Sequence, residues 1–123
     1  MKLGHLDVPS DVCRVIGDIL GRIGDKWAVF IIITLKDGSL RFGELEKRIG
    51  TVSKKTLTVT LRGLERDGYL TRTVTPSIPP RVDYELPGLG RDLLTPLDAL
   101  ASWALSHREQ VESARRSYDG ASG

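Results

Sequence analysis

The chain of 123 residues lacks several features that define whole classes of protein. It has a single cysteine, Cys13, so it cannot form an intrachain disulfide, which fits a reducing cytosol. Its longest apolar run, residues 27–35, is nine residues long, whereas a membrane-spanning helix needs about 20. Residues 1–9 lack the apolar stretch of a signal peptide and are expected to form a loose arm. We therefore expect a cytoplasmic protein without membrane contact.

Sequence motifs for catalysis and metal binding are also missing. The glycines at positions 17, 21 and 24 are not followed by the Gly-Lys-Ser/Thr of a phosphate-binding loop. There is no nucleophile elbow, and His5, His107 and one cysteine do not form a zinc-ligand set. We therefore expect no enzymatic activity, no cofactor and no metal site.

The positive charge of the chain is concentrated in one segment. The net charge is only +2, but residues 41–91 hold ten Lys and Arg against six Asp and Glu, and the remainder holds eight against ten. A local positive field of this kind attracts phosphate groups. Because a charged run is more often a solvated face, the charge alone does not identify a partner.

Hydrophobic periodicity and capping residues divide the chain into helices and one hairpin. We expect Ser10, Asp25 and Ser53 to cap their helices, and a short strand over 40–42 to lie beside the hairpin. The helix over 26–36 is apolar nearly all round and should be central in the core. The expected helices cover residues 11–23, 26–36, 42–49, 54–66 and 88–118, with a kink or a restart at Thr95-Pro96, where Pro96 is tolerable near a first-turn position. The expected hairpin has strands at 69–75 and 81–86, joined by the proline-rich tip 76–80.

The helix over 54–66 separates its side chains by chemistry. At 100° per residue, its three central leucines fall on one face, and Lys55, Val59, Arg62 and Arg66 fall on the opposite one. A solvated face usually mixes charge signs, but this outer face has no acidic residue. A helix pair with a basic second helix, followed by a hairpin, is the layout of a winged helix-turn-helix. The fold class is therefore mainly α with a small β-hairpin wing.

This layout predicts how the chain would contact double-stranded DNA. The second helix enters the major groove and the hairpin meets the phosphate backbone. Ser53 could act as a helix cap alone. The alternative function is a winged helix that binds another protein, which the acid-free face argues against. The base-reading candidates are Lys55, Thr58, Val59 and Arg62, and the backbone candidates are Ser53, Lys54, Arg72 and Arg81.

The apolar stripe of the last helix exceeds what one small domain can cover. A helix of about 20 residues is about 30 Å long, which is the diameter of a small domain. Part of the stripe should therefore lack a partner within the chain. The simplest cover is a second copy of the chain, so we expect a homodimer.

Six segments, taken in order, carry a resemblance to a known family. They resemble the HxlR-type branch of the MarR-like winged-helix regulators over about residues 12–108. The segments are IGDKW (23–27), LRFGEL (40–45), SKKTLT (53–58), LRGLERDGYL (61–70), PPRVDY (79–84) and LGR (89–91).

The resemblance implies a homodimeric bacterial or archaeal transcription factor that dimerises through its first and last helices. The chain would then be one domain, 1–123, with a DNA-reading core at about 40–87 and dimerisation helices at about 10–23 and 91–116. Repression of a pseudo-palindromic operator is the expected mode. The expected interface residues are Ile16, Leu20, Leu97, Leu100, Trp103, Ala104 and Val111.

Cys13 has two interpretations. Some family members use a cysteine near the N-terminus as a redox switch, although the proline that often follows it is Arg14 here. A single thiol among apolar neighbours is more often an inert packed residue. Cys13 is therefore a candidate redox sensor, and the effector is either an oxidant or a small molecule.

Overall fold

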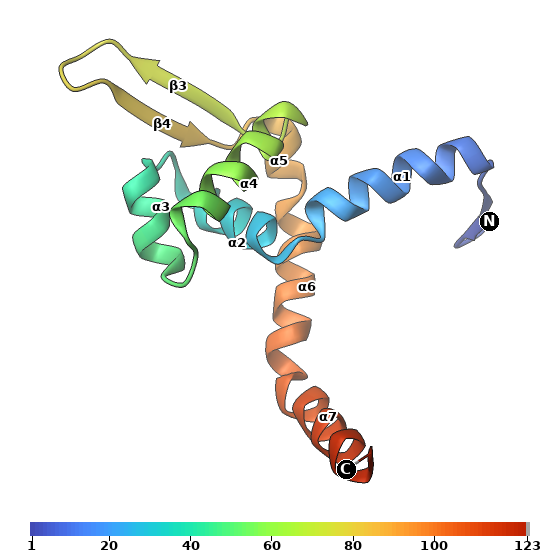
Figure 1. Ribbon diagram of the computed structural model, residues 1–123. Coiled ribbons are helices and arrows are strands. Elements are labelled where there is room, and N and C mark those ends of the chain that lie inside the picture. The colour runs from blue at the N-terminus through green and yellow to red at the C-terminus, as the bar shows by residue number, and fades with distance from the viewer. Residues whose placement is uncertain (123) are drawn as a thin grey trace.

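The computed structural model describes residues 1–122, with side chains through Ala121 (Figure 1). The fold is mainly helical, with two small antiparallel sheets. The elements are β1 (Lys2–Leu3), β2 (Leu6–Asp7), α1 (Ser10–Ile23), α2 (Lys26–Thr34), the 3₁₀ turn η1 (Leu35–Asp37), α3 (Phe42–Ile49), α4 (Lys54–Arg66), β3 (Thr71–Thr75), β4 (Arg81–Glu85), α5 (Gly88–Asp92), α6 (Leu94–Ser106) and α7 (Arg108–Ser122).

The helices of the helix-turn-helix begin and end where the sequence predicts. The Asp25 side chain accepts a hydrogen bond from the Ala28 amide at 3.2 Å, and Ser53 Oγ accepts one from the Thr56 amide at 3.1 Å. These bonds satisfy amides that have no partner inside the helix. Helix α3 ends at Gly50, whose φ of 84° is a conformation that favours glycine. Both predicted caps, at Asp25 and Ser53, are confirmed.

The hydrophobic core lies around α2, as its apolar composition predicts. Ala28, Ile31 and Ile32 of this helix are fully buried. Helices α3, α4 and α6 pack against α2 and supply much of the surrounding core. The core also includes Val29, Leu35, Leu40, Leu45, Val52, Leu57, Leu61, Leu64, Tyr69, Leu70, Leu86 and Leu97.

The hairpin forms the predicted wing beside the helix-turn-helix. Strands β3 and β4 pair antiparallel, with Thr71 opposite Glu85 and Thr75 opposite Arg81. Leu40 pairs with Tyr84 through two backbone hydrogen bonds, of 2.9 and 2.8 Å. Of the strand expected over 40–42, only Leu40 pairs, as an isolated bridge that joins the segment before α3 to the wing, because Phe42 already begins α3. The winged helix-turn-helix fold is therefore confirmed.

The N-terminal segment differs from the expectation in two respects. Ser10 is the first residue of α1 and not its cap, because Pro9 takes the cap position and makes no side-chain capping bond. Residues 1–9 are not a loose arm: β1 and β2 form a small hairpin that turns at Gly4, and the Val8 amide donates to the Met1 carbonyl at 2.7 Å.

The C-terminal helical segment is divided differently from the prediction. Pro96 lies in the first turn of α6, where a missing amide costs no hydrogen bond inside the helix, so of the predicted kink or restart the structure shows the restart. A second interruption, which the sequence does not predict, comes at His107. Its Nδ1 lies 2.8 Å from the Trp103 carbonyl, and the two rings stack with centroids 4.4 Å apart. Helix α7 then continues to Ser122, beyond the expected helix end near residue 118.

The terminal helices project from the compact winged-helix body (Figure 1). Helix α1 extends to one side and has no buried residue, while α6 and α7 extend in another direction. No helix within residues 1–122 is both long and apolar enough to cross a membrane. The large hydrophobic side chains exposed on these helices are Val12, Val15, Ile19, Leu20, Leu100, Trp103, Leu105, Val111 and Tyr118.

Candidate nucleic-acid interface

Helix α4 buries one face and exposes the opposite one, as its periodicity predicts. Leu57, Leu61 and Leu64 face the core and are at most 2% exposed. Lys55 and Arg62 are exposed on the outer face, and Val59 is 61% exposed between them. Within residues 1–121, neither cation has an ion-pair partner. The outer face therefore presents two unneutralised charges and an apolar methyl surface to solvent.

Two hydroxyls at the start of α4 are held by bonds inside the helix. Ser53 Oγ caps the helix and also lies 2.9 Å from Thr56 Oγ1. Thr58 Oγ1 donates to the Lys54 carbonyl at 2.8 Å, and its side chain is half-buried. Thr58 is thus less available than Lys55 or Arg62, although its oxygen can still accept a hydrogen bond.

Lys54 is engaged with the neighbouring helix. Its Nζ lies 2.8 Å from Glu46 Oε1 of α3, and 5.9 Å from the centre of the Phe42 ring. The Lys54 side chain is 75% exposed, so this ion pair is worth at most about 1 kcal/mol. A phosphate group could replace Glu46 as the ion-pair partner of Lys54 at a small cost in free energy.

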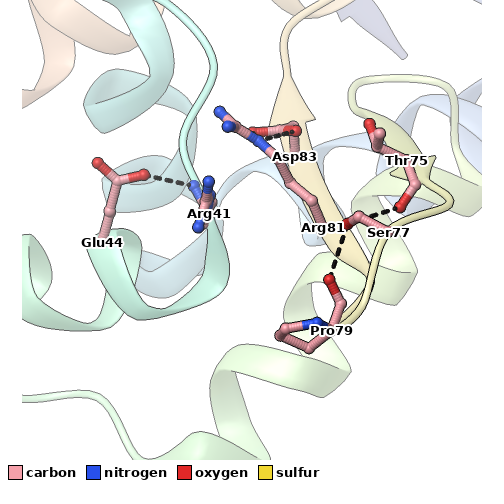
Figure 2. A network of polar contacts seen from close by, with 7 residues as sticks. All are labelled: Arg41, Glu44, Thr75, Ser77, Pro79, Arg81 and Asp83. Atoms are coloured by element: carbon pink, nitrogen blue, oxygen red, sulfur yellow. Dashed lines mark hydrogen bonds and ion pairs between the residues drawn. The ribbon is translucent and has the colours of Figure 1, made fainter.

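The wing carries two further cations. Arg72 is exposed on β3, and Arg81 begins β4 next to the tip. Arg81 Nε donates to Asp83 at 3.0 Å, and Ser77 Oγ donates to the Pro79 carbonyl at 2.7 Å (Figure 2). The Asp83 contact neutralises part of the Arg81 charge, whereas Arg72 has no ion-pair partner within residues 1–121.

Arg62 and Arg72 both line a hollow between α4 and the wing. The hollow has a volume of about 290 Å³ and is also lined by Phe42, Thr58, Leu61, Glu65 and Tyr84. The sequence alone does not predict that these two arginines lie close together, because no local pattern tells which residue of β3 faces α4. Their proximity follows from the antiparallel register and the Leu40–Tyr84 bridge, which are tertiary features.

Arg41 immediately precedes α3 and lies close to Glu44. Its backbone amide, not its guanidinium, donates to Glu44 at 3.0 Å (Figure 2). Glu44 thereby satisfies an amide at the start of α3. The Arg41 guanidinium stays exposed beside the interface.

The residues expected at a dimer interface fall into two groups. Leu20, Leu100, Trp103, Ala104 and Val111 are exposed, and Ile16 is half-buried. Leu97 is only 4% exposed because it packs in the core of its own chain, so little of its surface is left for a partner. Cys13 is half-buried on α1, with Sγ 3.6 Å from the Val8 carbonyl.

Comparisons with known proteins agree with this arrangement. The model of the HxlR-like helix-turn-helix family matches residues 22–112. An HTH-type transcriptional regulator of Methanothermobacter thermautotrophicus is 44% identical over 95 residues, which cover 77% of this chain and 72% of the relative.

Two solved structures extend the comparison to the fold. The transcriptional regulator ytfH from Salmonella typhimurium has a TM-score of 0.75 and 37% identity, covering 82% of this chain and 90% of that one. The redox regulator HypR in its reduced form has a TM-score of 0.73 and 33% identity, covering 80% and 98%. The winged helix-turn-helix, its basic outer face and these matches establish that the chain is a transcriptional regulator, not an enzyme, and belongs to the HxlR-like helix-turn-helix family.

Proposed function

We propose that the chain is a sequence-specific repressor that binds a pseudo-palindromic operator as a homodimer. The observation that carries the proposal is the outer face of α4, where Lys55, Val59 and Arg62 are exposed and neither cation has an ion-pair partner within residues 1–121. A side chain on such a helix reaches base edges when the helix lies in the major groove.

Each residue of this face has a chemistry suited to reading bases. A guanidinium such as that of Arg62 can bond guanine O6 and N7 at once, and Lys55 can donate to the same atoms. Val59 offers methyl groups that can pack against the methyl of thymine. Thr58 can add a hydrogen bond to a base, although its hydroxyl already donates to the Lys54 carbonyl.

The cations around this face would hold the protein on the DNA backbone. Lys54 and Ser53 lie at the start of α4, and Arg72 and Arg81 lie on the wing. Contacts with phosphates fix the register of a protein on the duplex but carry no sequence information directly. Lys54 and Arg81 would exchange Glu46 and Asp83 for phosphates.

The exposed apolar faces of the terminal helices support the homodimer. Leu20 is 57% exposed on α1, and Leu100 and Trp103 are 54% and 55% exposed on α6. Burying such a surface against a second copy removes apolar area from water, and a two-fold dimer repeats the same patch on both subunits. Two recognition helices related in this way match an inverted repeat in DNA. Binding across a promoter in the cytoplasm would block transcription.

A redox effector acting through Cys13 is part of the same proposal. The half-buried thiol lies on α1, the helix proposed to meet the partner copy, and the similar protein HypR is a redox regulator. Diamide or hydrogen peroxide should weaken or strengthen operator binding by the native chain but not by Cys13→Ser. If both proteins respond alike, the thiol has no sensing role, and the regulator then senses either a non-covalent small molecule or nothing at all.

The proposal is tested by selecting sites from random duplex DNA and titrating them with the protein. We expect two chains per selected site, and a loss of affinity of orders of magnitude between 50 and 200 mM salt if six or more phosphates are contacted. Failure to enrich any sequence, together with salt-independent binding to other proteins, would favour a protein-binding winged helix instead.

A further inference from the structure

Helix α1 is joined to the winged-helix body at one end only. No residue of α1 is buried, and most of the helix projects away from the body (Figure 1). At its last turn, Ile23 packs against the core, and Arg22 pairs with Asp67. Within residues 1–121, this pair is the only side-chain hydrogen bond or ion pair between α1 and the body. The direction of α1 therefore depends on few contacts.

The partner of Arg22 belongs to the recognition helix. Arg22 Nε donates to Asp67 Oδ2 at 2.7 Å, and Asp67 is the residue that ends α4. The two side chains are 35% and 28% exposed, so water screens their attraction less than at an open surface. Arg66 Nη1 is also 3.8 Å from this carboxylate, but its side chain is 80% exposed. Arg22 thus makes the shorter and more sheltered contact.

A glycine inside α4 provides the place where the Arg22 guanidinium lies. A Cβ added at Gly63 would overlap Arg22 Nη1 and would lie 2.8 Å from Cζ. Glycine is among the least favourable residues in the interior of a helix, whereas alanine is the most favourable. The contact with Arg22 gives a physical reason for glycine at this position of α4.

The space beside this contact is not filled by packed side chains. A groove of about 780 Å³ lies between α1 and the far end of α4, and its walls include Ile19, Tyr69 and Leu89 together with Arg22 and Asp67. Because the groove is open, close packing does not hold α1 at a fixed angle to α4. The Arg22 side chain spans the two helices where packing is absent.

We propose that Arg22, seated on Gly63 and bonded to Asp67, is a positioning residue that fixes the recognition helix relative to α1. This inference rests on the proposed function, in which α1 contacts the partner copy. The contact of Arg22 with Gly63 and Asp67, called the α1–α4 joint, then sets the separation of the two α4 helices in the dimer. Since half-sites are matched to that separation, about 34–36 Å for one turn of DNA, the joint selects the half-site spacing of the operator.

The test measures spacing preference rather than affinity alone. An operator is recovered from random duplex DNA, and its half-sites are then moved apart or together one base pair at a time. The native protein should show one sharp optimum. Gly63→Ala displaces the guanidinium while favouring the helix, and Arg22→Gln and Asp67→Asn remove the ion pair. Each variant should bind the native spacing at least tenfold more weakly, with a broader or shifted optimum.

Three further measurements decide the outcome. Binding to an isolated half-site should stay within twofold of native, because the outer face of α4 is untouched. The double variant Gly63→Ala/Arg22→Gln should be no weaker than either single variant, because both break the same joint. Arg14→Gln, which removes an exposed arginine from the same helix, is the matched control and should keep the native optimum.

The results that overturn the inference differ from those that overturn the proposed function. Variants that keep the native optimum show that Arg22 does not set the spacing. Equal losses at every spacing and at the half-site show that the residues support α4 itself. If the native protein has no optimum at all, the proposed dimeric operator complex fails, and this inference fails with it.

Discussion

The winged-helix body buries a core of large apolar side chains, whereas the terminal helices leave many of theirs exposed. Leu45, Leu57 and Leu64 of the body are completely buried, whereas Leu20 of α1 is 57% exposed and Leu105 of α6 is 71% exposed. The same residue type therefore has two roles in one chain. The body closes its own core, while the projecting helices present surfaces that suit association with a second copy. Four predictions test this difference.

The largest effect is expected from a leucine of the body. Leu64→Ala leaves a cavity in the core and should lower the free energy of unfolding by about 2–5 kcal/mol. Leu105→Ala removes the same atoms from an exposed site and should change it by less than about 0.5 kcal/mol. Denaturant titration of both variants measures the contrast, and equal losses would show that the end of α6 around Leu105 is part of the folding core in the same way as Leu97.

The second effect concerns the exposed face of α6. Trp103→Ala should weaken dimerisation by about 2–4 kcal/mol, as expected for a central interface aromatic. Sedimentation at micromolar concentration should give about twice the 13.5 kDa chain mass for the native protein and less for the variant.

Phe30→Ala is the matched control for Trp103→Ala, because Phe30 is an aromatic of the body that is 45% exposed. It should leave the dimer intact. A native protein that sediments as a monomer, or a control that dissociates equally, would remove the proposed distinction between body and terminal helices.

The third prediction concerns exposed residues of the body that should affect DNA binding but not the free energy of unfolding. Lys55→Ala and Arg62→Ala should each weaken operator binding by about 1–3 kcal/mol. Each should also reduce the difference in affinity between the operator and random DNA. Both side chains are exposed, so unfolding should change by less than about 0.5 kcal/mol. Arg108→Ala removes an exposed arginine from α7 and should leave the binding isotherm unchanged. Native affinity in both α4 variants would rule out this face as the reader.

The smallest effect is expected at the wing. Arg81→Ala should weaken binding to operator and random DNA alike. In a plot of the logarithm of the binding constant against the logarithm of the salt concentration, it should also reduce the steepness of the line by about one. Asp83→Asn frees Arg81 from its ion pair and should not weaken either complex. An Arg81→Ala variant that loses affinity only for the operator would place this arginine on a base and not on a phosphate.

Local signals were sufficient to predict the body. Ser53 and Asp25 cap their helices through short-range bonds, and Gly50 and Gly68 take positive φ where the helices end. The leucine spacing of α4 then determines which face is buried and, by exclusion, which cations face outward. These features depend on neighbours within a few residues, so they can be read from the sequence.

The parts that could not be predicted depend on distant contacts or on competing local choices. Arg22 meets Gly63 and Asp67 only after the last turn of α1 is placed against α4. The break at His107 carries no glycine or proline signal, whereas the helix restart beside Pro96, with this proline in a first turn, is what the sequence predicts. The burial of Leu97 is likewise a result of packing against the core, and its position in the apolar stripe of the helix does not predict it.

The central claim is that the outer face of α4 reads bases, and it is tested most directly by comparing the sites selected by two proteins. Native protein and Arg62→Ala are each used to select from the same pool of random duplex DNA. We predict an inverted repeat for the native protein, and for the variant the same repeat with one symmetric pair of positions, a G·C pair in each half, no longer specified. An unchanged consensus for Arg62→Ala, or no consensus for the native protein, would contradict the claim.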